Sequence, residues 1–331
     1  MFNKIAIIGD GAMGTVCSIL LCEKNIPTVL WGHDGAQLEK FKNARENTLF
    51  LPGYKLPDSL EFQADDSKVF EGVDLVVCAV PCQFIRPVFG RLKQYVPISA
   101  PIVSVAKGIE NKTLLRPSQI LEDVLGAGIK VAALSGPTIA DELAKKLPAT
   151  ACAASSDKQL AQAVQVTFNI YWFRVYSNTD IVGVELAGAM KNVIAIAAGI
   201  IDGVGAGDNA KAALLSRGLA EITRLGVAMG AEERTFSGLT GLGDLVTTCI
   251  SPSGRNRSLG QRIGQGQSVK EALAATKSVV EGVATCESVK ELAREKAVEM
   301  PIVEAVYAVL FEEKPVFDAI NALMSRKLRA E

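Results

Sequence analysis

The chain has 331 residues, 49% of them hydrophobic and 21% charged, which is the composition of a globular protein long enough for two domains. This composition excludes collagen, a coiled coil and a disordered chain. With 35 basic and 36 acidic residues the formal charge is −1, so an anion site must be built locally and no nucleic-acid partner is expected.

His33 is the only histidine of the sequence. General acid–base chemistry, serine triads and most zinc sites draw on imidazole, so an enzyme of this composition is expected to move protons with Lys, Asp or Glu. The seven cysteines form no C-x-x-C motif, which predicts buried thiols in a reducing compartment and no metal cluster. Met1 leads into a β-like run without a signal-peptide pattern, and we expect a cytoplasmic protein.

The first half alternates β-branched runs with helical stretches, the pattern of a doubly wound, mainly parallel sheet. A helical periodicity over residues 15–24 joins the first two strands into a βαβ unit. Prolines and a glycine in residues 50–60 predict an irregular excursion. The predicted strands are residues 4–8, 28–31, 75–79, 102–105 and 130–134.

Beyond about Tyr176, long Ala-, Leu- and Glu-rich segments predict an all-α domain. We place the boundary so that residues 1–178 form a Rossmann-like domain and residues 179–331 a helical domain, with Asn178 or Thr179 capping the incoming helix. The predicted helices are residues 181–198, 210–229, 269–275, 286–294 and 302–311.

The glycine-rich segment 9–14, G-D-G-A-M-G, follows a predicted strand and opens a predicted helix. In this context Gly9 permits the tight turn, Gly11 the close approach of a pyrophosphate, and Gly14 close packing of helix and strand. The segment therefore predicts dinucleotide binding, although another Gly-rich α/β turn has the same pattern.

An acidic residue at the end of the second strand normally binds the adenosine ribose. The chain offers W-G-H-D at residues 31–34. Asp34 there favours NAD, His33 fits a 2′-phosphate or stacks on adenine, and both also fit a solvated turn. The cofactor is expected to be NAD or NADP, with the preference open.

Two further segments place polar residues where predicted strands end. Lys107 follows the strand at 102–105, and the sequence S-G-P-T at residues 135–138 follows the next strand. Open α/β sheets bind ligands at the carboxyl ends of their strands, so these segments predict one crevice. A surface lysine is the plain alternative for Lys107.

Residues 181–201 are long and apolar enough to span a membrane, but they carry Glu185 and Lys191. A charge at mid-bilayer costs roughly 2.5–3.5 kcal/mol, so we interpret the segment as a buried helix and expect no membrane span. Burial disfavours the ammonium form, which makes Lys191 usable as a base near neutral pH. A structural lysine paired with Glu185 explains the pattern equally well.

The second half also carries a glycine-rich and a basic motif. G-L-G-D-L at residues 241–245 precedes two threonines, and G-R-N-R spans residues 254–257. Guanidinium and amide donors suit a phosphate, because they pair with two oxygens at once. The alternative is that Arg255 and Arg257 belong to a solvated loop.

Taken together, these motifs resemble NAD(P)-dependent glycerol-3-phosphate dehydrogenase of the bacterial type. The segments that carry the resemblance are residues 9–14, 31–34, 79–81, 106–108, 135–138, 173–176, 188–195, 241–245 and 254–257. The resemblance implies interconversion of sn-glycerol 3-phosphate and dihydroxyacetone phosphate by hydride transfer with NAD or NADP, for phospholipid synthesis. It also implies a helical substrate-binding domain, no metal and a homodimer.

Carried over position by position, the resemblance makes Lys191 the general acid–base, oriented by Asp244. Lys107 and Asn192 would then hold and polarise the carbonyl. The other positions matching substrate-binding residues are Gly136, Thr138, Thr248, Gly254, Arg255 and Asn256. Those matching cofactor-binding residues are Gly9, Gly11, Ala12, Met13, Gly14, His33, Asp34, Lys107, Ala140, Arg255, Val279 and Glu281.

The chain departs from the family pattern in its glycine loop. The family usually has Gly-Ala-Gly-Ser and an aromatic residue, whereas this chain has Asp10 for the alanine and Ala12 and Met13 for the last two. A carboxylate at position 10 repels phosphate unless it points away. Gly-x-Gly-x-Met-Gly is also typical of the 3-hydroxyacid and 6-phosphogluconate dehydrogenases, our second reading. A redox sensor without turnover is the third, and it predicts loss of Lys191 or Asp244.

Overall fold

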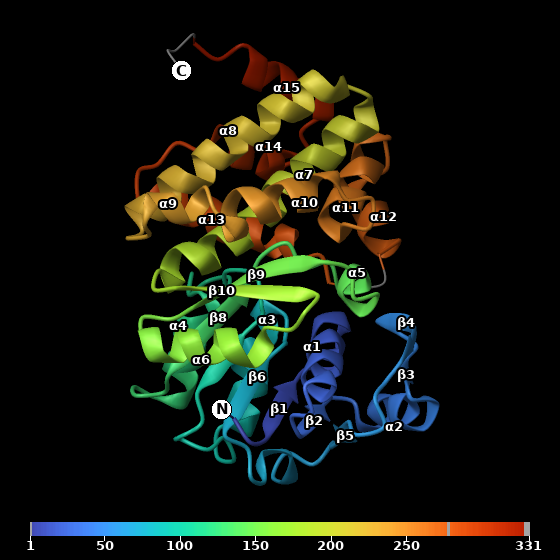
Figure 1. Ribbon diagram of the computed structural model, residues 1–331. Coiled ribbons are helices and arrows are strands. Elements are labelled where there is room, and N and C mark those ends of the chain that lie inside the picture. Colours follow the sequence, from blue (N-terminus) through green and yellow to red (C-terminus); the bar gives the residue numbers. More distant parts are fainter. Residues whose placement is uncertain (1, 277–278, 328–331) are drawn as a thin grey trace. The chain divides into compact units, whose positions relative to one another are not determined.

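The computed structural model describes residues 2–276 and 279–327 (Figure 1). The chain divides into two units, one made of Met1–Lys107 and Leu115–Glu185, the other of Gly108–Leu114 and Leu186–Glu331. This division places the first residues of helix α7 (Ile181–Val204) with unit 1. The boundary expected between residues 178 and 179 stays a prediction.

Unit 1 is built on a mainly parallel sheet, as predicted. Its order is β10-β9-β8-β7-β6-β1-β2-β5, and β8 with β9 is its antiparallel pair among the described strands. The bounds are β1 (Ile5–Ile8), β2 (Thr28–Trp31), β5 (Glu61–Phe62), β6 (Leu75–Cys78), β7 (Ile102–Ser104), β8 (Val131–Ser135), β9 (Ala149–Ala154) and β10 (Phe173–Asn178). Because the order reverses at β1 and β6, the carboxyl ends of these strands form a topological switch point.

Helices cover both faces of this sheet. Ile5 and Ile7 of β1 point into one apolar core, and Ala6 and Ile8 point into the other, because successive side chains of a strand alternate. The first core includes α1 and α6, and the second includes α3 and α4. The helices of unit 1 are α1 (Ala12–Glu23), α2 (Gly35–Ala44), α3 (Cys82–Leu92), α4 (Pro117–Leu125), α5 (Ala140–Ala144) and α6 (Lys158–Phe168).

The structure corrects the sequence prediction at several strands. Strands β5, β9 and β10 were not predicted, and the expected irregular excursion at residues 50–60 contains β4 (Leu51–Lys55), which pairs with β3 (Glu46–Asn47). The last of these corrections matters for function, because β3 carries a buried Asn47 close to the glycine loop.

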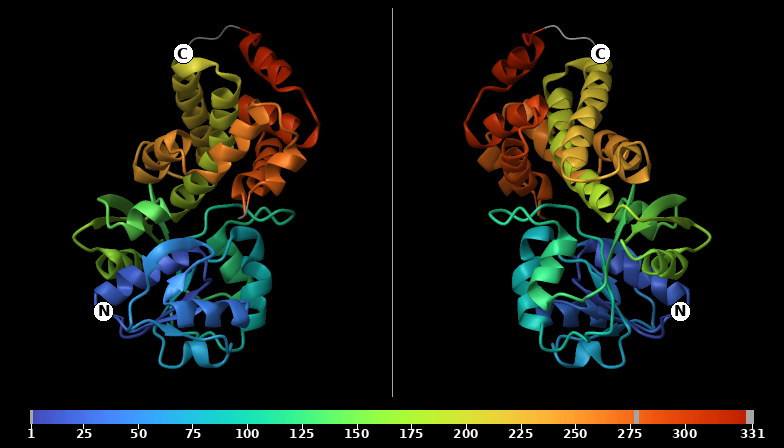
Figure 2. Two further views of the ribbon diagram at one scale, coloured as in Figure 1. Left: turned by 90° about the vertical axis from the view of Figure 1, so that its right-hand side faces the viewer. Right: turned by 90° about the vertical axis from the view of Figure 1, so that its left-hand side faces the viewer.

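All the regular elements of unit 2 among its described residues are helices, as predicted. Its longest helices, α7 and α8, lie side by side in both views of Figure 2, with Gly218 of α8 against Ile194 of α7. The helices after α7 are α8 (Gly207–Ala228), α9 (Glu233–Phe236), α10 (Asp244–Ile250), α11 (Arg255–Gly264), α12 (Val269–Ala274), α13 (Glu281–Glu295), α14 (Pro301–Phe311) and α15 (Val316–Met324).

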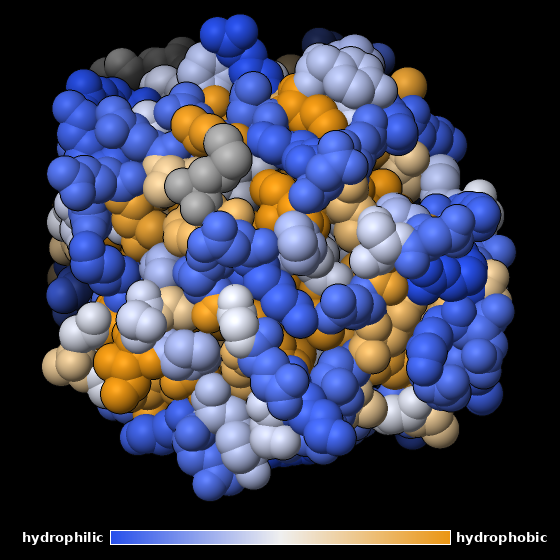
Figure 3. Space-filling view, turned by 60° about the horizontal axis from the view of Figure 1, so that its bottom comes forward, coloured by the Kyte–Doolittle hydropathy of each residue, from blue (hydrophilic) through white to orange (hydrophobic). Residues whose placement is uncertain are grey.

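Helix α7 is the segment that resembles a membrane span in length and composition among the described residues. Its most apolar window is 94% buried within the protein, which identifies α7 as a core helix. On the face drawn in Figure 3, hydrophobic side chains form small groups between hydrophilic ones, the pattern of an ordinary water-exposed surface.

Candidate active site

The glycine loop between β1 and α1 has the geometry that a pyrophosphate requires. Gly9 has φ +116°, and a Cβ there would lie 2.7 Å from the carbonyl oxygen of Ala79. A Cβ on Gly14 would lie 2.0 Å from the carbonyl oxygen of Gly9, whereas a Cβ on Gly11 would meet nothing within 4 Å. Packing therefore explains Gly9 and Gly14, and Gly11 faces open space that a ligand can enter.

The first turn of α1 offers backbone amides to an anion. Gly11 is the N-cap of α1 and supplies no side-chain cap, so no side chain of the cap residue covers the amides that follow. Ala12 and Met13, which replace the serine and aromatic residue of the common loop, are the first two residues of the helix. Neither side chain carries a hydrogen-bond donor of N–H or O–H type, so the donors that these two residues could offer an anion are their backbone amides.

The side chain of Asn47 holds this loop in place through hydrogen bonds, and Asn47 was not among the predicted site residues. Its side chain is 1% exposed, and Nδ2 donates to the carbonyl oxygen of Asp10 at 2.8 Å and to Oγ1 of Thr15 at 2.7 Å. The carbonyl of Asp10 and the amide of Gly11 point in opposite directions across a trans peptide, so fixing one fixes the other. The sequence feature that could have identified Asn47 is its position as a polar residue just before the predicted irregular segment at residues 50–60.

The end of β2 places the predicted ribose-binding residues on the surface. His33 and Asp34 are exposed, and Oδ1 of Asp34 accepts the amides of Ala36 and Gln37 at 2.9 and 3.1 Å, which caps α2. The carboxylate of Asp10 turns toward the same strand end, since a Cβ built on Gly32 would lie 2.7 Å from Oδ2 of Asp10.

The carboxyl ends of β7 and β8 come together as predicted. Nζ of Lys107, which follows β7, donates to the carbonyl oxygen of Gly136 at 2.8 Å and to Oγ1 of Thr138 at 3.4 Å. Gly136 has φ +151°, and a Cβ there would lie 2.9 Å from Cα of Ala151, so only glycine fits. Ala140 is the first residue of α5 and is half-buried.

A buried ion pair joins α7 and α10 in unit 2. Nζ of Lys191, in α7, lies 2.8 Å from Oδ1 of Asp244 and donates to Oγ1 of Thr248 at 2.5 Å. The side chains of Lys191 and Asp244 are 7% and 2% exposed. The alternative partner Glu185 is excluded, because its carboxylate accepts from Arg116 and from the backbone amide of Ser118.

The glycine-rich motif explains how Asp244 reaches Lys191. Residues Leu239–Gly243 form a π-helical turn, a feature frequent at functional sites, and α10 starts with Asp244. A Cβ on Gly241 would lie 2.0 Å from the carbonyl oxygen of Phe236, so the turn needs glycine there. Asp244 thus lies in the first turn of α10, where the helix dipole favours a carboxylate.

Asn192 and Asn256 form a second buried polar contact beside this pair. Nδ2 of Asn256 donates to Oδ1 of Asn192 at 2.9 Å, and the amide of Gly282 donates to Oδ1 of Asn256 at 3.0 Å. A close helix–helix approach brings them together, since a Cβ on Gly199 of α7 would lie 1.9 Å from the carbonyl oxygen of Arg257 in α11.

The two arginines of the basic motif have different surroundings. Arg255 is exposed and donates from Nη1 to the carbonyl oxygen of Val279 at 2.9 Å. Arg257 pairs with Asp202 through Nε at 2.7 Å and Nη2 at 2.6 Å, and its side chain is 14% exposed. The solvated-loop alternative is therefore wrong for Arg257, and Arg255 is the arginine with access to a ligand.

The N-terminus of α11 completes the polar surface around Arg255. Gly254 is its N-cap and supplies no side-chain cap, so its first amides are placed for an anion. Val279 is 42% exposed, and Glu281 starts α13 in a half-buried position. Across residues 2–276 and 279–327, no group of three or more His, Cys, Asp or Glu is placed to hold a metal ion.

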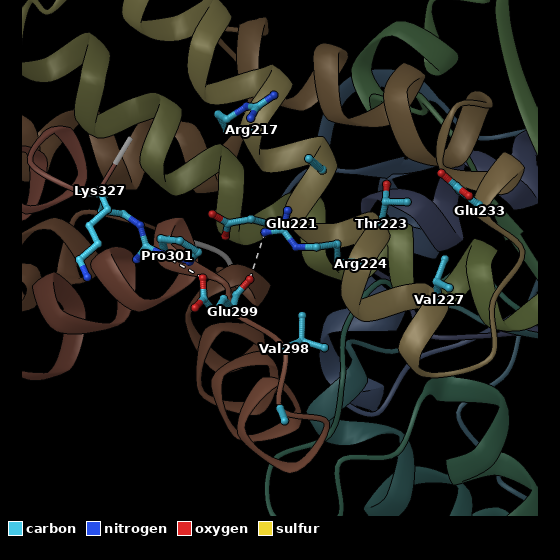
Figure 4. Close-up of a pocket in the computed structure, with 13 residues that line it drawn as sticks. Arg217, Glu221, Thr223, Arg224, Val227, Glu233, Val298, Glu299, Pro301 and Lys327 are labelled. Carbon is cyan, nitrogen blue, oxygen red and sulfur yellow. Dashed lines mark hydrogen bonds and ion pairs between the residues drawn. The ribbon is translucent and has the colours of Figure 1, made fainter. Parts of the chain in front are cut away.

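A cavity of about 890 Å³ lies elsewhere in unit 2 (Figure 4). It is bordered by α8 and by the segment before α14, and Arg217, Arg224 and Glu299 line it. None of the predicted site residues lines this cavity.

A doubly wound sheet with a glycine loop that opens α1, together with a helical unit carrying a buried lysine–carboxylate pair, defines a nicotinamide-dependent dehydrogenase. Two family models, described as the N-terminus and C-terminus of NAD-dependent glycerol-3-phosphate dehydrogenase, match residues 4–161 and 180–321. The chain belongs to the NAD-dependent glycerol-3-phosphate dehydrogenase family.

Individual relatives agree with the family models over the whole chain. Glycerol-3-phosphate dehydrogenase [NAD(P)+] from Geobacter sp. (strain M21) is 48% identical and covers 100% of this chain and 99% of its own. The crystal structure of the enzyme from Coxiella burnetii has a TM-score of 0.94 at 35% identity, covering 98% and 99% of the two chains. The yeast enzyme has a TM-score of 0.82 at 28% identity, covering 96% and 98%. This membership decides against the hydroxyacid-dehydrogenase reading and the sensor reading.

Proposed function

We propose that the protein interconverts sn-glycerol 3-phosphate and dihydroxyacetone phosphate by hydride transfer with NAD or NADP. The observation that carries this proposal is the buried Lys191–Asp244 pair beside Asn192, Asn256 and Arg255. The ion pair suits proton transfer, Arg255 and Asn256 suit a phosphate, and the substrate needs both. Family membership supports this reading.

Residues of the glycine loop are assigned to the cofactor. The open space at Gly11 and the N-terminus of α1 fit a dinucleotide pyrophosphate, and a bound nicotinamide supplies or accepts the hydride. The resemblance assigns Ala140, Val279 and Glu281 to the nicotinamide end. The described residues offer no metal group, and the proposed reaction uses none.

Lys191 is assigned the role of transferring a proton to and from the substrate oxygen. When the carbonyl carbon of dihydroxyacetone phosphate receives a hydride, its oxygen becomes an alkoxide, and the ammonium of Lys191 gives that oxygen a proton. In the reverse direction the neutral amine takes the hydroxyl proton back. Asp244 accepts a hydrogen bond from Nζ at 2.8 Å and Thr248 accepts another at 2.5 Å, so the amine is held in one orientation.

The carbonyl and the phosphate are assigned to separate groups of donors. Asn192 and Lys107 match the residues that polarise the carbonyl in the family pattern. Arg255, Asn256 and the first amides of α11 after Gly254 match the phosphate clamp. A chain of formal charge −1 needs such local donors to bind a dianion.

The cellular setting is proposed from the same sources. All seven cysteines are free and buried, which fits a reducing cytoplasm. The reductive direction would supply glycerol 3-phosphate for glycerophospholipid synthesis, and the family resemblance supports a homodimer. Sedimentation velocity tests the dimer, which a single species of the 35.1 kDa chain mass would contradict.

The experiment that tests the substrate compares dihydroxyacetone phosphate with dihydroxyacetone as oxidants of NADH. We expect dihydroxyacetone to have a kcat/KM lower by about a thousandfold or more, because it leaves the phosphate donors unpaired. Equal kcat/KM values for the two ketones would contradict the assignment of Arg255 and Asn256.

A further inference from the structure

The carboxylates of Asp10 and Asp34 both lie near the carboxyl end of β2, but their contacts differ. Oδ1 of Asp34 accepts the amides of Ala36 and Gln37 and is engaged as the cap of α2. Asp10 comes from the glycine loop, and its carboxylate lies against Gly32, the residue that follows β2.

The carboxylate of Asp10 occupies the space that a side chain at position 32 would fill. A Cβ built on Gly32 would lie 2.7 Å from Oδ2 and 2.9 Å from Cγ of Asp10. Glycine at position 32 therefore makes room for a carboxylate that reaches in from the loop. The strand end of β2 carries an acidic group even though the residue directly after the strand has no side chain.

The end of the second strand is where Rossmann folds read the adenosine ribose. A carboxylate there accepts a hydrogen bond from the 2′-hydroxyl of NAD(H), and its charge opposes the 2′-phosphate of NADP(H). Partial burial of the carboxylate strengthens its electrostatic repulsion of the 2′-phosphate, because less water is present to screen the two charges.

We propose that Asp10, rather than Asp34, reads the ribose of the cofactor and makes this dehydrogenase prefer NAD(H) over NADP(H). The inference deepens the proposed function and rests on it. It assigns the specificity-determining role to the one glycine-loop position where a carboxylate replaces the family's usual alanine.

The surroundings of Asp10 support this role. Asn47 donates to its carbonyl oxygen at 2.8 Å, so the backbone from which the carboxylate extends is fixed. Burial raises the pKa of the Asp10 carboxyl and Asp34 adds to this, while its own backbone amide and His33 act in the opposite direction. A ribose hydroxyl would give this partly buried carboxylate a further donor.

Binding of NADH and NADPH to the protein alone, followed by nucleotide fluorescence, tests the inference without turnover. We expect the wild type to bind NADPH at least about tenfold more weakly than NADH. Asp10→Asn keeps the size of the side chain and removes its charge, and we expect it to bring the two Kd values within about threefold of each other. Asp10→Ala restores the family's usual loop and should do the same.

Two matched variants separate a local role from a general effect of charge. Asp34→Asn removes the same charge, and asparagine caps helices as well as aspartate, so α2 keeps its cap. Glu39→Gln removes a carboxylate on the exposed part of α2 that pairs with Lys42. Neither variant should change the ratio of the two Kd values by more than about twofold.

Three results would overturn the inference. They are equal Kd values for NADH and NADPH in the wild type, an unchanged ratio in both Asp10 variants, and a shift in Asp34→Asn as large as that in Asp10→Asn. Failure of the proposed function gives a different pattern, in which NADH is still preferred but dihydroxyacetone phosphate is not reduced.

Discussion

Lys191 and Asp244 form an ion pair with 2.8 Å between Nζ and Oδ1, and both side chains are almost fully buried. Removing one partner of such a pair leaves an uncompensated buried charge, which costs roughly 3–5 kcal/mol. We propose that the pair keeps Lys191 in a buried position from which its proton can be passed to a substrate and recovered. Its two members come from α7 and from the start of α10.

Substitution by alanine should have opposite effects at Gly11 and Gly14 of the glycine loop, with a loss of NADH binding at Gly11 and a loss of stability at Gly14. Gly11→Ala should leave the melting temperature within about 2 °C of wild type, because the backbone there has φ −67° and a Cβ meets nothing within 4 Å. It should weaken NADH binding by about tenfold or more, since the methyl group enters the ligand's space. Fluorescence titration with NADH and thermal unfolding measure the two effects.

Gly14→Ala is the matched control for that variant. Its Cβ would lie 2.0 Å from the carbonyl oxygen of Gly9. We therefore expect Gly14→Ala to lower the stability of the fold strongly even in the absence of NADH. A stable Gly14→Ala protein, or a Gly11→Ala protein with normal NADH affinity, would contradict this account of the loop.

The two arginines of the basic motif should separate substrate binding from stability. Arg255→Ala removes an exposed guanidinium assigned to the substrate phosphate, and we expect the KM for dihydroxyacetone phosphate to rise by about a hundredfold. Arg257→Ala removes two contacts to Asp202, which keeps Lys211 as a partner, and should lower the free energy of unfolding by about 1–2 kcal/mol. Steady-state kinetics and urea unfolding distinguish them, and an unchanged KM in Arg255→Ala would remove that residue from the phosphate site.

Asn47 should affect the cofactor more than the substrate. Asn47→Ala frees the carbonyl of Asp10, so the Gly11 amide loses its fixed direction, and we expect the Kd for NADH to rise by about fivefold to tenfold. The KM for dihydroxyacetone phosphate at saturating NADH should stay within about twofold of wild type. A variant that melts earlier but binds NADH normally would show that Asn47 only stabilises the fold.

Glu221 gives a pH dependence of stability that can be measured at a site without catalytic residues (Figure 4). Burial raises the pKa of its carboxyl from 4.5 to about 7, and Glu304 adds to this. The amides of Ile302 and Val303 and the charge of Arg224 act in the opposite direction. The folded protein therefore binds this proton more tightly than the unfolded chain does, and the associated stability is present below pH 4.5 and lost as the pH rises through about 7.

The linked free energy is about 3 kcal/mol. Glu221→Gln carries no titrating proton and can still accept the amide of Ile302, so its melting temperature should fall less than that of wild type between pH 5 and pH 8. Parallel pH profiles for the two proteins would contradict the assignment.

The parts of the fold that followed from the sequence are those with strong apolar periodicity. The runs that became β1, β2, β6, β7 and β8 are fully buried, and each was predicted to within a residue or two. Strand β9 is A-T-A-C-A-A, whose alanines give no β signal, and β10 has alternating exposed positions typical of an edge. Strand β9 joins the sheet by pairing with β8, and β10 joins it by pairing with β9, and periodicity encodes neither pairing.

Side-chain partners were the least predictable part of the site. The sequence singled out Lys191 because it interrupts an apolar helix. Periodicity alone offered Glu185 as its partner, and only the family resemblance pointed to Asp244. The true partner, Asp244, is distant along the chain and is brought close by a π-helical turn. Asn47 gave a weaker signal still, because its role depends on a two-residue strand that reaches the glycine loop.

The initial rate of NADH oxidation at 340 nm with dihydroxyacetone phosphate, measured for wild type and two Lys191 variants, decides whether Lys191 is the proton donor of this reaction. Lys191→Met removes the proton donor, and Lys191→Met combined with Asp244→Asn also removes the buried charge that would otherwise destabilise the fold. We predict rapid oxidation by the wild type and a kcat lower by about a thousandfold or more in both variants, with the Kd for NADH nearly unchanged. A near-normal kcat in the folded double variant would contradict the role of Lys191, and no oxidation by the wild type would contradict the proposed reaction.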